Sequence, residues 1–321
     1  MSTHASGSET SADGTNTQSE ASGADKVNDG QPSLKWVRGE LIGRSGRISV
    51  YLALNTNTSE FIIAKQVEIA QNTVSSSALQ LLKRESETLK DLEHPNIIQY
   101  LGFEITPTMS SLFVPANHEL TLFVSDLMLF SCHSFLEYVS GGTIGDLILK
   151  SDTFSENVIK SFTAQVLRGV EYLHSQGILH RDITADHVHV DSKGVCKISD
   201  FGNSKHIAPS LGHNTSADTI EKVYNTTAID IWSVGCLALQ MWAGERLWNV
   251  DETGLFGVMF KLWASKAPPP LPERCMLSGP AEDFRKKCFI INLDESPSAT
   301  VLLTHEYLEL PVDWEFNGVT V

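Results

Sequence analysis

Two charged side chains and two triplets that each contain an aspartate stand out in this sequence as groups that can do chemistry. Glu85 falls between leucines on the apolar face of an expected helix, where an unpaired carboxylate would be costly. Lys65 ends an apolar strand twenty residues earlier. Taken singly, the two are typical of a strand-end lysine and a solvated helix glutamate. Upstream of His-Arg-Asp at 180–182 and Asp-Phe-Gly at 200–202, they fit a lysine that contacts nucleotide phosphates and a glutamate that orients it.

The elements expected around Lys65 are mainly strands. Three β-like runs occupy 36–42, 49–54 and 61–67, and turn-forming residues at 55–59 separate the last two as a hairpin would. A helix is expected over 77–92, because its apolar residues recur every three or four positions. The first third of the chain is therefore predicted to be rich in strands.

The rest of the chain is expected to be mostly helical. Ser155 is a candidate N-cap for a helix whose apolar stripe runs from Val158 to Leu173. Short runs at 188–190 and 196–198 flank a turn and predict a second hairpin. Further helices are expected at 231–243, 255–263, 281–289 and 299–304. The predicted fold class is α+β, with a small strand-rich lobe and a larger helical lobe.

Composition sets limits on location and partners. Residues 1–33 are polar with almost nothing apolar, so we expect a disordered tail without a signal peptide. The net charge of -15 disfavours nucleic acid and anionic membranes as partners. The most apolar stretch, 120–130, is shorter than the roughly 20 residues that a membrane span needs. Five cysteines without a Cys-x-x-Cys pair are typical of reduced thiols, which favours a cytoplasmic protein.

Several motifs in a fixed order carry a resemblance to a known family. They are EHPNIIQYLGFE at 93–104, FLEYVSGG at 135–142, EYLHSQGILHRD at 171–182, GVCKISDFG at 194–202 and DIWSVGC at 230–236. The chain resembles eukaryotic protein kinases and, more narrowly, the fungal MAP kinase kinase kinases, as a degenerate copy. The resemblance covers about 34–316, which divides into an N-lobe at 34–138 and a C-lobe at 139–316.

The resemblance implies roles for the groups that react. Asp182 would accept the proton of a substrate hydroxyl, and Asp200 would hold Mg²⁺. Lys65 and Glu85 would position the phosphates of ATP. Asp230 would brace the catalytic loop from a central helix.

The resemblance also implies a nucleotide pocket. Gly43 and Val50 would cover the nucleotide, and the backbone of Glu137 and Val139 would meet adenine. An activation-segment phosphate would be met by Arg181. These expectations make ATP and Mg²⁺ the implied cofactors.

The nucleotide pocket departs from the family pattern. Ser45 and Ile48 replace the second and third glycines of the loop that approaches phosphate, where a side chain obstructs. Ile63 replaces the alanine that roofs adenine, and His189 replaces the apolar residue beneath it. Both faces of the base site are therefore altered.

The catalytic loop departs as well. Thr184 stands where a lysine would neutralise the transferring phosphate, and His187 stands where an asparagine would bind a second Mg²⁺. Magnesium prefers oxygen ligands, so His187 is a weak replacement as a metal ligand. Charge stabilisation is most of what such an enzyme contributes, so both changes are expected to lower the rate.

The activation segment is short and lacks its usual end. Only 27 residues separate Gly202 from Asp230, and none of them forms an Ala-Pro-Glu motif. The arginine expected to pair with that glutamate is Ser296. Both partners of one ion pair are therefore missing, which costs less than losing one.

An insertion is expected at 112–133, between two adjacent strands. A connection of this length argues against an ordered hairpin. It is either a docking loop or translated non-coding sequence such as a retained intron, and joining Ser111 to Phe135 favours the second hypothesis because it restores a family-like sequence.

Three functional hypotheses follow from these residues. The first is an ATP-dependent serine/threonine kinase acting on a protein of a MAP kinase cascade, supported by Lys65, Glu85, Asp182 and Asp200. The second is a pseudokinase that acts as a protein-binding module, supported by the altered residues. The third is a degenerate gene product that does not fold fully. Phosphoryl transfer is expected to be weak or absent.

Overall fold

The computed structural model describes residues 34–70, 77–109, 128–151, 154–207, 226–246 and 270–319. The chain divides into two units, Met1–Gln31 and Pro32–Val321, and all of the described residues belong to the second. The predicted disordered segment 1–33 and the predicted helix 255–263 lie outside the described residues. Within the described ranges, no helix has the length and apolar character that crossing a membrane requires.

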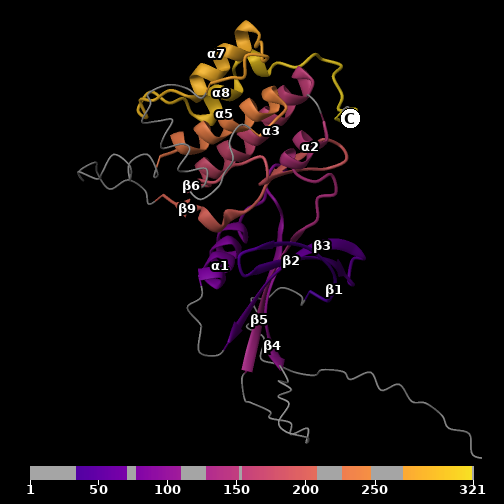
Figure 1. Ribbon diagram of the computed structural model, residues 1–321. Helices are drawn as coiled ribbons and strands as arrows, with labels where there is room; N and C mark the ends of the chain where they lie inside the picture. The colour runs from indigo at the N-terminus through magenta and orange to yellow at the C-terminus, as the bar shows by residue number, and fades with distance from the viewer. Residues whose placement is uncertain are drawn as a thin grey trace, which may run out of the picture. The chain divides into compact units, whose positions relative to one another are not determined.

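Five antiparallel strands form one sheet in the order β1-β2-β3-β5-β4 (Figure 1). They are β1 (Trp36–Ser45), β2 (Ile48–Asn55), β3 (Glu60–Ala70), β4 (Tyr100–Met109) and β5 (Met128–Glu137). The first three confirm the predicted strands, each with a few added residues. The sheet register places Lys65 of β3 between Val50 of β2 and Ser134 of β5. Lys65 therefore lies in a central strand, fixed by hydrogen-bonded neighbours on both sides.

One helix, α1 (Ser77–Leu89), packs against this sheet. Its buried face includes Leu79, Leu82 and Glu85, and the two leucines pack with Val67 of β3 and Cys132 of β5. The helix ends three residues earlier than the predicted 77–92. The chain soon reaches Pro95, and a residue before proline disfavours helical backbone.

The remaining described elements are mostly helices, as predicted (Figure 1). The helices are α2 (Ile144–Lys150), α3 (Glu156–Ser175), α5 (Ala228–Ala243), α7 (Gly279–Cys288) and α8 (Ala299–Leu303), and 3-10 turns are η1 (Phe201–Asn203) and η2 (Glu306–Leu308). The short strands are β6 (Ile178–Leu179), β7 (Val188–Val190), β8 (Cys196–Ile198) and β9 (Lys205–His206). The Ser155 side chain caps α3 by accepting from the backbone N–H of Val158. The predicted hairpin is confirmed, because β7 and β8 pair antiparallel.

Backbone hydrogen bonds join the first lobe to the second close to the reactive residues. The Ile98 N–H donates to the Ile198 carbonyl at 2.9 Å, and the Ile198 N–H donates to the Asn96 carbonyl at 2.9 Å. The Thr88 and Ser204 hydroxyls lie 3.2 Å apart. These contacts tie α1 and the chain after it to β8 and η1, the segment that contains Asp200.

The predicted insertion 112–133 ends earlier than expected. Residues 128–133 form the first part of β5 and pair with both β3 and β4. Cys132 lies opposite Val67 and Ile105 in that register. The apolar composition of the segment did not identify 128–133 as part of β5, because the strand preference of a residue depends on the neighbours that the sheet supplies. Residues 112–127 lie outside the described residues.

The corrected strand brings a histidine into the sheet lobe. His133 is 5% exposed, and its Nδ1 has no hydrogen-bond partner among the described residues. Trp36 packs against the ring edge to face, with centroids 5.0 Å apart. Burial first, and the Arg38 cation second, together lower the pKa of His133 to about 4. The ring is therefore neutral in the folded chain at neutral pH.

We expect His133→Leu to stabilise the chain and to reduce its sensitivity to acid. An unsatisfied buried polar atom costs about 1–3 kcal/mol. In the unfolded chain the ring titrates near 6.5. Between about pH 6.5 and pH 4 the unfolded state therefore binds more protons, so stability falls as pH falls through that window. Urea unfolding at pH 7.5 and pH 5 measures both effects, with the exposed His206→Leu as the matched control. An equal loss of unfolding free energy between pH 7.5 and pH 5 in the wild type and both variants would contradict this role of His133.

Candidate active site

The Lys65 ammonium and the Glu85 carboxylate form the ion pair expected from their positions. Nζ lies 2.6 Å from Oε1, and Glu85 is 3% exposed. Burial lowers the pKa of Lys65, but the Glu85 and Asp200 carboxylates outweigh burial, so the pKa stands above its ordinary value. Lys65 is therefore charged at neutral pH, with Asp200 near enough to act on it. The structure confirms the predicted contact, while its role toward phosphate stays a prediction.

Asp200 follows β8 in a left-handed backbone conformation, with φ of 64°. This conformation is uncommon for a residue other than glycine, and such residues gather at functional sites. Burial raises the pKa of Asp200, but the surrounding groups, with the Lys65 cation the largest of them, outweigh burial and keep the pKa below its ordinary value. Phe201 is fully buried edge to face against His180, with ring centroids 4.7 Å apart. The Asp200 carboxylate is therefore ionised at neutral pH, and the buried Phe201 ring next to it in the chain fixes its backbone.

The loop that carries Asp182 is held by Asp230 at the start of α5. Asp230 is 0% exposed, and its carboxylate accepts from the backbone N–H of His180 at 3.0 Å and of Arg181 at 2.7 Å. His174 Nε2 contacts the same carboxylate at 2.9 Å. The bracing contact expected of Asp230 is therefore present. This contact fixes the backbone of the loop, in which Arg181 has a left-handed conformation with φ of 66°.

The Asp182 carboxylate is oriented by a residue that sequence reasoning missed. Asn203 Nδ2 donates to Asp182 Oδ2 at 3.0 Å. The Asn203 carbonyl in turn accepts from Arg181 Nε at 2.8 Å. The only signal in the sequence was the place of Asn203 directly after Asp-Phe-Gly. The expected activation-segment partner of Arg181 would lie in 208–225, outside the described residues.

His187 lies between the two reactive carboxylates. Its Nδ1 contacts the Asp182 backbone carbonyl at 2.8 Å and lies 3.7 Å from the Asp182 carboxylate. Its Nε2 lies 3.4 Å from Asp200 Oδ2. Asp182, His187 and Asp200 therefore lie close together.

The donor set at this place fits only part of a magnesium site. Asp200 offers the carboxylate oxygen that Mg²⁺ prefers, but His187 offers an imidazole nitrogen where a second oxygen is needed. Among the described residues no group of three histidine, cysteine or acidic side chains is placed to hold a metal ion. The residues present therefore do not fit the pair of magnesium ions that the resemblance implies.

The residues expected around the sugar and base lie on the facing strands. Gly43 of β1 pairs with Val50 of β2, and the turn between these strands contains Gly46 with φ of 57°. Glycine is suited to that backbone conformation. Gly46 thus shapes the turn, while Ser45 and Ile48 pair across its base.

The expected adenine site begins where β5 ends. The Glu137 side chain accepts from the Gln99 N–H and from Lys197 Nζ, each at 2.7 Å, which fixes the start of the segment leading to buried Val139. His189 of β7 is half-buried; burial lowers the pKa of this ring, and the Lys65 cation lowers it further. His189 is therefore neutral at neutral pH, and a neutral ring packs against an uncharged base more favourably than a charged ring would.

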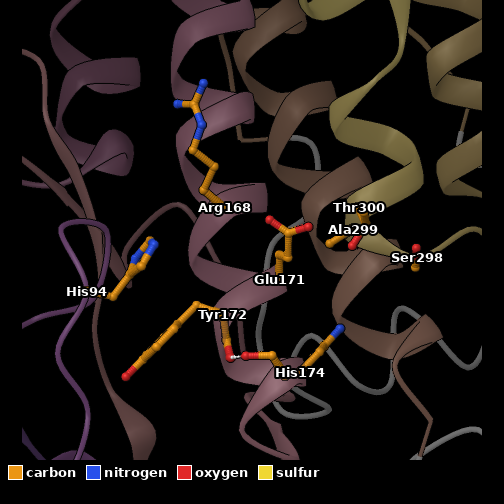
Figure 2. Close-up of a pocket in the computed structure, with 9 residues that line it drawn as sticks. His94, Arg168, Glu171, Tyr172, His174, Ser298, Ala299 and Thr300 are labelled. Atoms are coloured by element: carbon orange, nitrogen blue, oxygen red, sulfur yellow. Dashed lines mark hydrogen bonds between the residues drawn. The ribbon is translucent and has the colours of Figure 1, made fainter.

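A separate groove lies on the helical part of the chain. It has a volume of about 560 Å³ and is bordered by His94, Arg168, Glu171, Tyr172 and residues 298–300. Figure 2 shows Arg168, Glu171, Tyr172 and His174 projecting from one helix, α3, with Ser298 to Thr300 beyond them. None of the reactive residues borders this groove. The contacts among Lys65, Asp182 and Asp200 and their neighbours therefore define the candidate active site, and this groove is separate from it.

Comparison with known proteins decides the family. The sequence model of the protein kinase domain family matches residues 36–308 of this chain. The chain belongs to the protein kinase domain family. The fold is therefore the two-lobed protein kinase fold, and the predicted family is confirmed.

Relatives of this protein kinase domain include fungal MAP kinase kinase kinases. The chain is 39% identical over 300 residues to the serine/threonine-protein kinase BCK1/SLK1/SSP31 of Saccharomyces cerevisiae, covering 88% of this chain and 19% of that protein. It is 39% identical over 313 residues to the MAP kinase kinase kinase mkh1 of Schizosaccharomyces pombe, covering 89% of this chain and 25% of that protein. The chain thus spans a quarter or less of the length of these two relatives. It is a kinase domain homologous to those of MAP kinase kinase kinases.

Proposed function

We propose that this chain is a serine/threonine protein kinase domain of the MAP kinase kinase kinase type that binds ATP and transfers its γ-phosphate slowly. The 2.6 Å contact between Lys65 and Glu85 carries the nucleotide-binding part of the proposal. In this family such a pair positions the phosphates of ATP. Asp200 lies near enough to Lys65 to raise the pKa of that lysine.

The slow transfer follows from the loop after Asp182. Asp182 is placed to accept a proton from a substrate hydroxyl, and Asn203 orients its carboxylate. Thr184 offers no cation for the charge that develops on the transferring phosphate. Preorganised charge is the largest contribution in such reactions, and losing one donor costs about 10²- to 10³-fold in rate. The proposal therefore combines nucleotide binding with weak catalysis.

A second candidate is a pseudokinase that acts as a protein-binding module in a MAP kinase cascade. The absence of charge at Thr184 favours it, as does the nitrogen of His187 where oxygen is expected. Under either candidate we propose a protein partner from such a cascade and a cytoplasmic location. The two differ in phosphoryl transfer, which only the first candidate performs, and nucleotide binding is required only for the first.

Removing the Lys65–Glu85 pair is expected to abolish stabilisation by ATP. Truncating Lys65 alone would leave the buried Glu85 charge unpaired, so the test uses Lys65→Met with Glu85→Gln, which removes both charges. We expect the wild type to melt at a higher temperature with ATP and a divalent metal, and the double variant to show no shift. Lys83→Ala, on the exposed face of α1, is the matched control. Equal ATP-dependent shifts in the wild type and the double variant would refute the assignment of this pair.

A further inference from the structure

The two ring nitrogens of His187 have different partners. Nδ1 lies 2.8 Å from the Asp182 backbone carbonyl, and a carbonyl can only accept, so Nδ1 carries a proton. Nε2 lies 3.4 Å from Asp200 Oδ2, and in the neutral ring it carries the lone pair. A histidine that binds a metal through one nitrogen typically donates from the other to a carbonyl or carboxylate. His187 already has this arrangement.

The 3.4 Å distance fits two ligands of one metal ion. A charge-assisted bond from a ring N–H to a carboxylate is shorter, at about 2.8 Å. Imidazole nitrogen and carboxylate oxygen both lie roughly 2.1 Å from a divalent transition metal. With those lengths, the observed separation of Nε2 and Asp200 Oδ2 subtends an angle of roughly 110° at the metal, within the range of adjacent ligands.

The chemistry of the two ligands selects among metals. Magnesium is hard and favours oxygen, whereas imidazole suits transition metals, and carboxylate and phosphate oxygens suit manganese as well. Within the described residues the protein supplies only two such ligands here. Nucleotide phosphate oxygens and water therefore have to complete the coordination, as they do in other phosphoryl-transfer sites.

We propose that His187 Nε2 and Asp200 Oδ2, together with the phosphates of a bound nucleotide, hold a divalent transition-metal ion in preference to Mg²⁺. The inference rests on the nucleotide binding proposed above. His187 sets the metal preference of the site. The Asp182 backbone carbonyl orients the His187 ring by accepting a hydrogen bond from Nδ1.

The test compares ATP binding in MnCl₂ and in MgCl₂. We expect the wild type to bind ATP at least about tenfold more tightly with Mn²⁺, and His187→Asn to lose most of that preference because an oxygen ligand returns. The exposed His206→Asn keeps the preference and is the matched control. A second readout is independent of affinity. Electron spin echo modulation of bound Mn²⁺ should show a directly coordinated nitrogen in the wild type and not in His187→Asn.

The outcomes separate this inference from the proposed function. ATP binding that is equally tight in both metals, or tighter with Mg²⁺, overturns the metal preference and leaves nucleotide binding intact. An unchanged preference or an unchanged nitrogen signal in His187→Asn overturns the role of His187. ATP binding in neither metal, in the wild type and in His187→Asn alike, overturns the proposed function together with this inference.

Discussion

The double variant Thr184→Lys/His187→Asn is expected to transfer phosphate about 10²- to 10³-fold faster than the wild type. Lysine at 184 adds a cation beside Asp182, and asparagine at 187 returns an oxygen ligand beside Asp200. Thr184 is only partly buried, so a longer side chain has room to extend. Its carbonyl accepts from the His187 N–H at 3.1 Å, a backbone contact that neither substitution removes.

The measurement is transfer of radiolabelled γ-phosphate to casein and to the chain itself. The two single variants are expected to lie between the wild type and the double variant. Asp182→Asn added to the double variant should return the rate to background, because the proton acceptor is then lost. A double variant that binds ATP and is no faster than the wild type would show that the missing charges do not limit the rate.

Asp230→Ala is expected to cost about 3 kcal/mol or more of unfolding free energy. The buried carboxylate accepts from two backbone N–H groups and contacts His174 Nε2. Each buried donor left without an acceptor costs about 1–3 kcal/mol. The loop from His180 to Asp182 then loses its attachment to α5, so we expect the variant to lose any phosphoryl transfer as well.

Urea unfolding measures this cost. Asp230→Asn keeps an acceptor and is expected to be intermediate. Asp186→Ala removes an aspartate from the same loop whose half-exposed carboxylate pairs with Arg246, and such surface pairs contribute about 1 kcal/mol or less. Equal stability of Asp230→Ala and Asp186→Ala would contradict the bracing role of Asp230.

Local patterns in the sequence were sufficient where short-range physics decides the outcome. Ser155 caps α3 because its hydroxyl reaches a backbone donor three residues on. Glu85 pairs with Lys65 because a buried carboxylate needs a cation, and the strand and helix periods place both on facing surfaces. These contacts follow from residue type and spacing, so they were predictable.

Contacts set by tertiary structure were not predictable in the same way. Residues 128–133 were assigned to an insertion, yet they pair in β5, because strand register depends on the neighbours that the sheet offers. Asn203 reaches Asp182 only once η1 has turned the chain back toward the loop. The direction of His187 depends on a backbone carbonyl, which no residue type reveals.

The central claim is that the site still holds a nucleotide although its catalytic charges are depleted. Calorimetric titration of the wild-type chain with ATP, in MgCl₂ and in MnCl₂, tests it most directly. The account predicts saturable binding at one site per chain, lost in Lys65→Met/Glu85→Gln and retained in Lys83→Ala. A wild-type chain that is folded by circular dichroism and binds ATP in neither metal would contradict it.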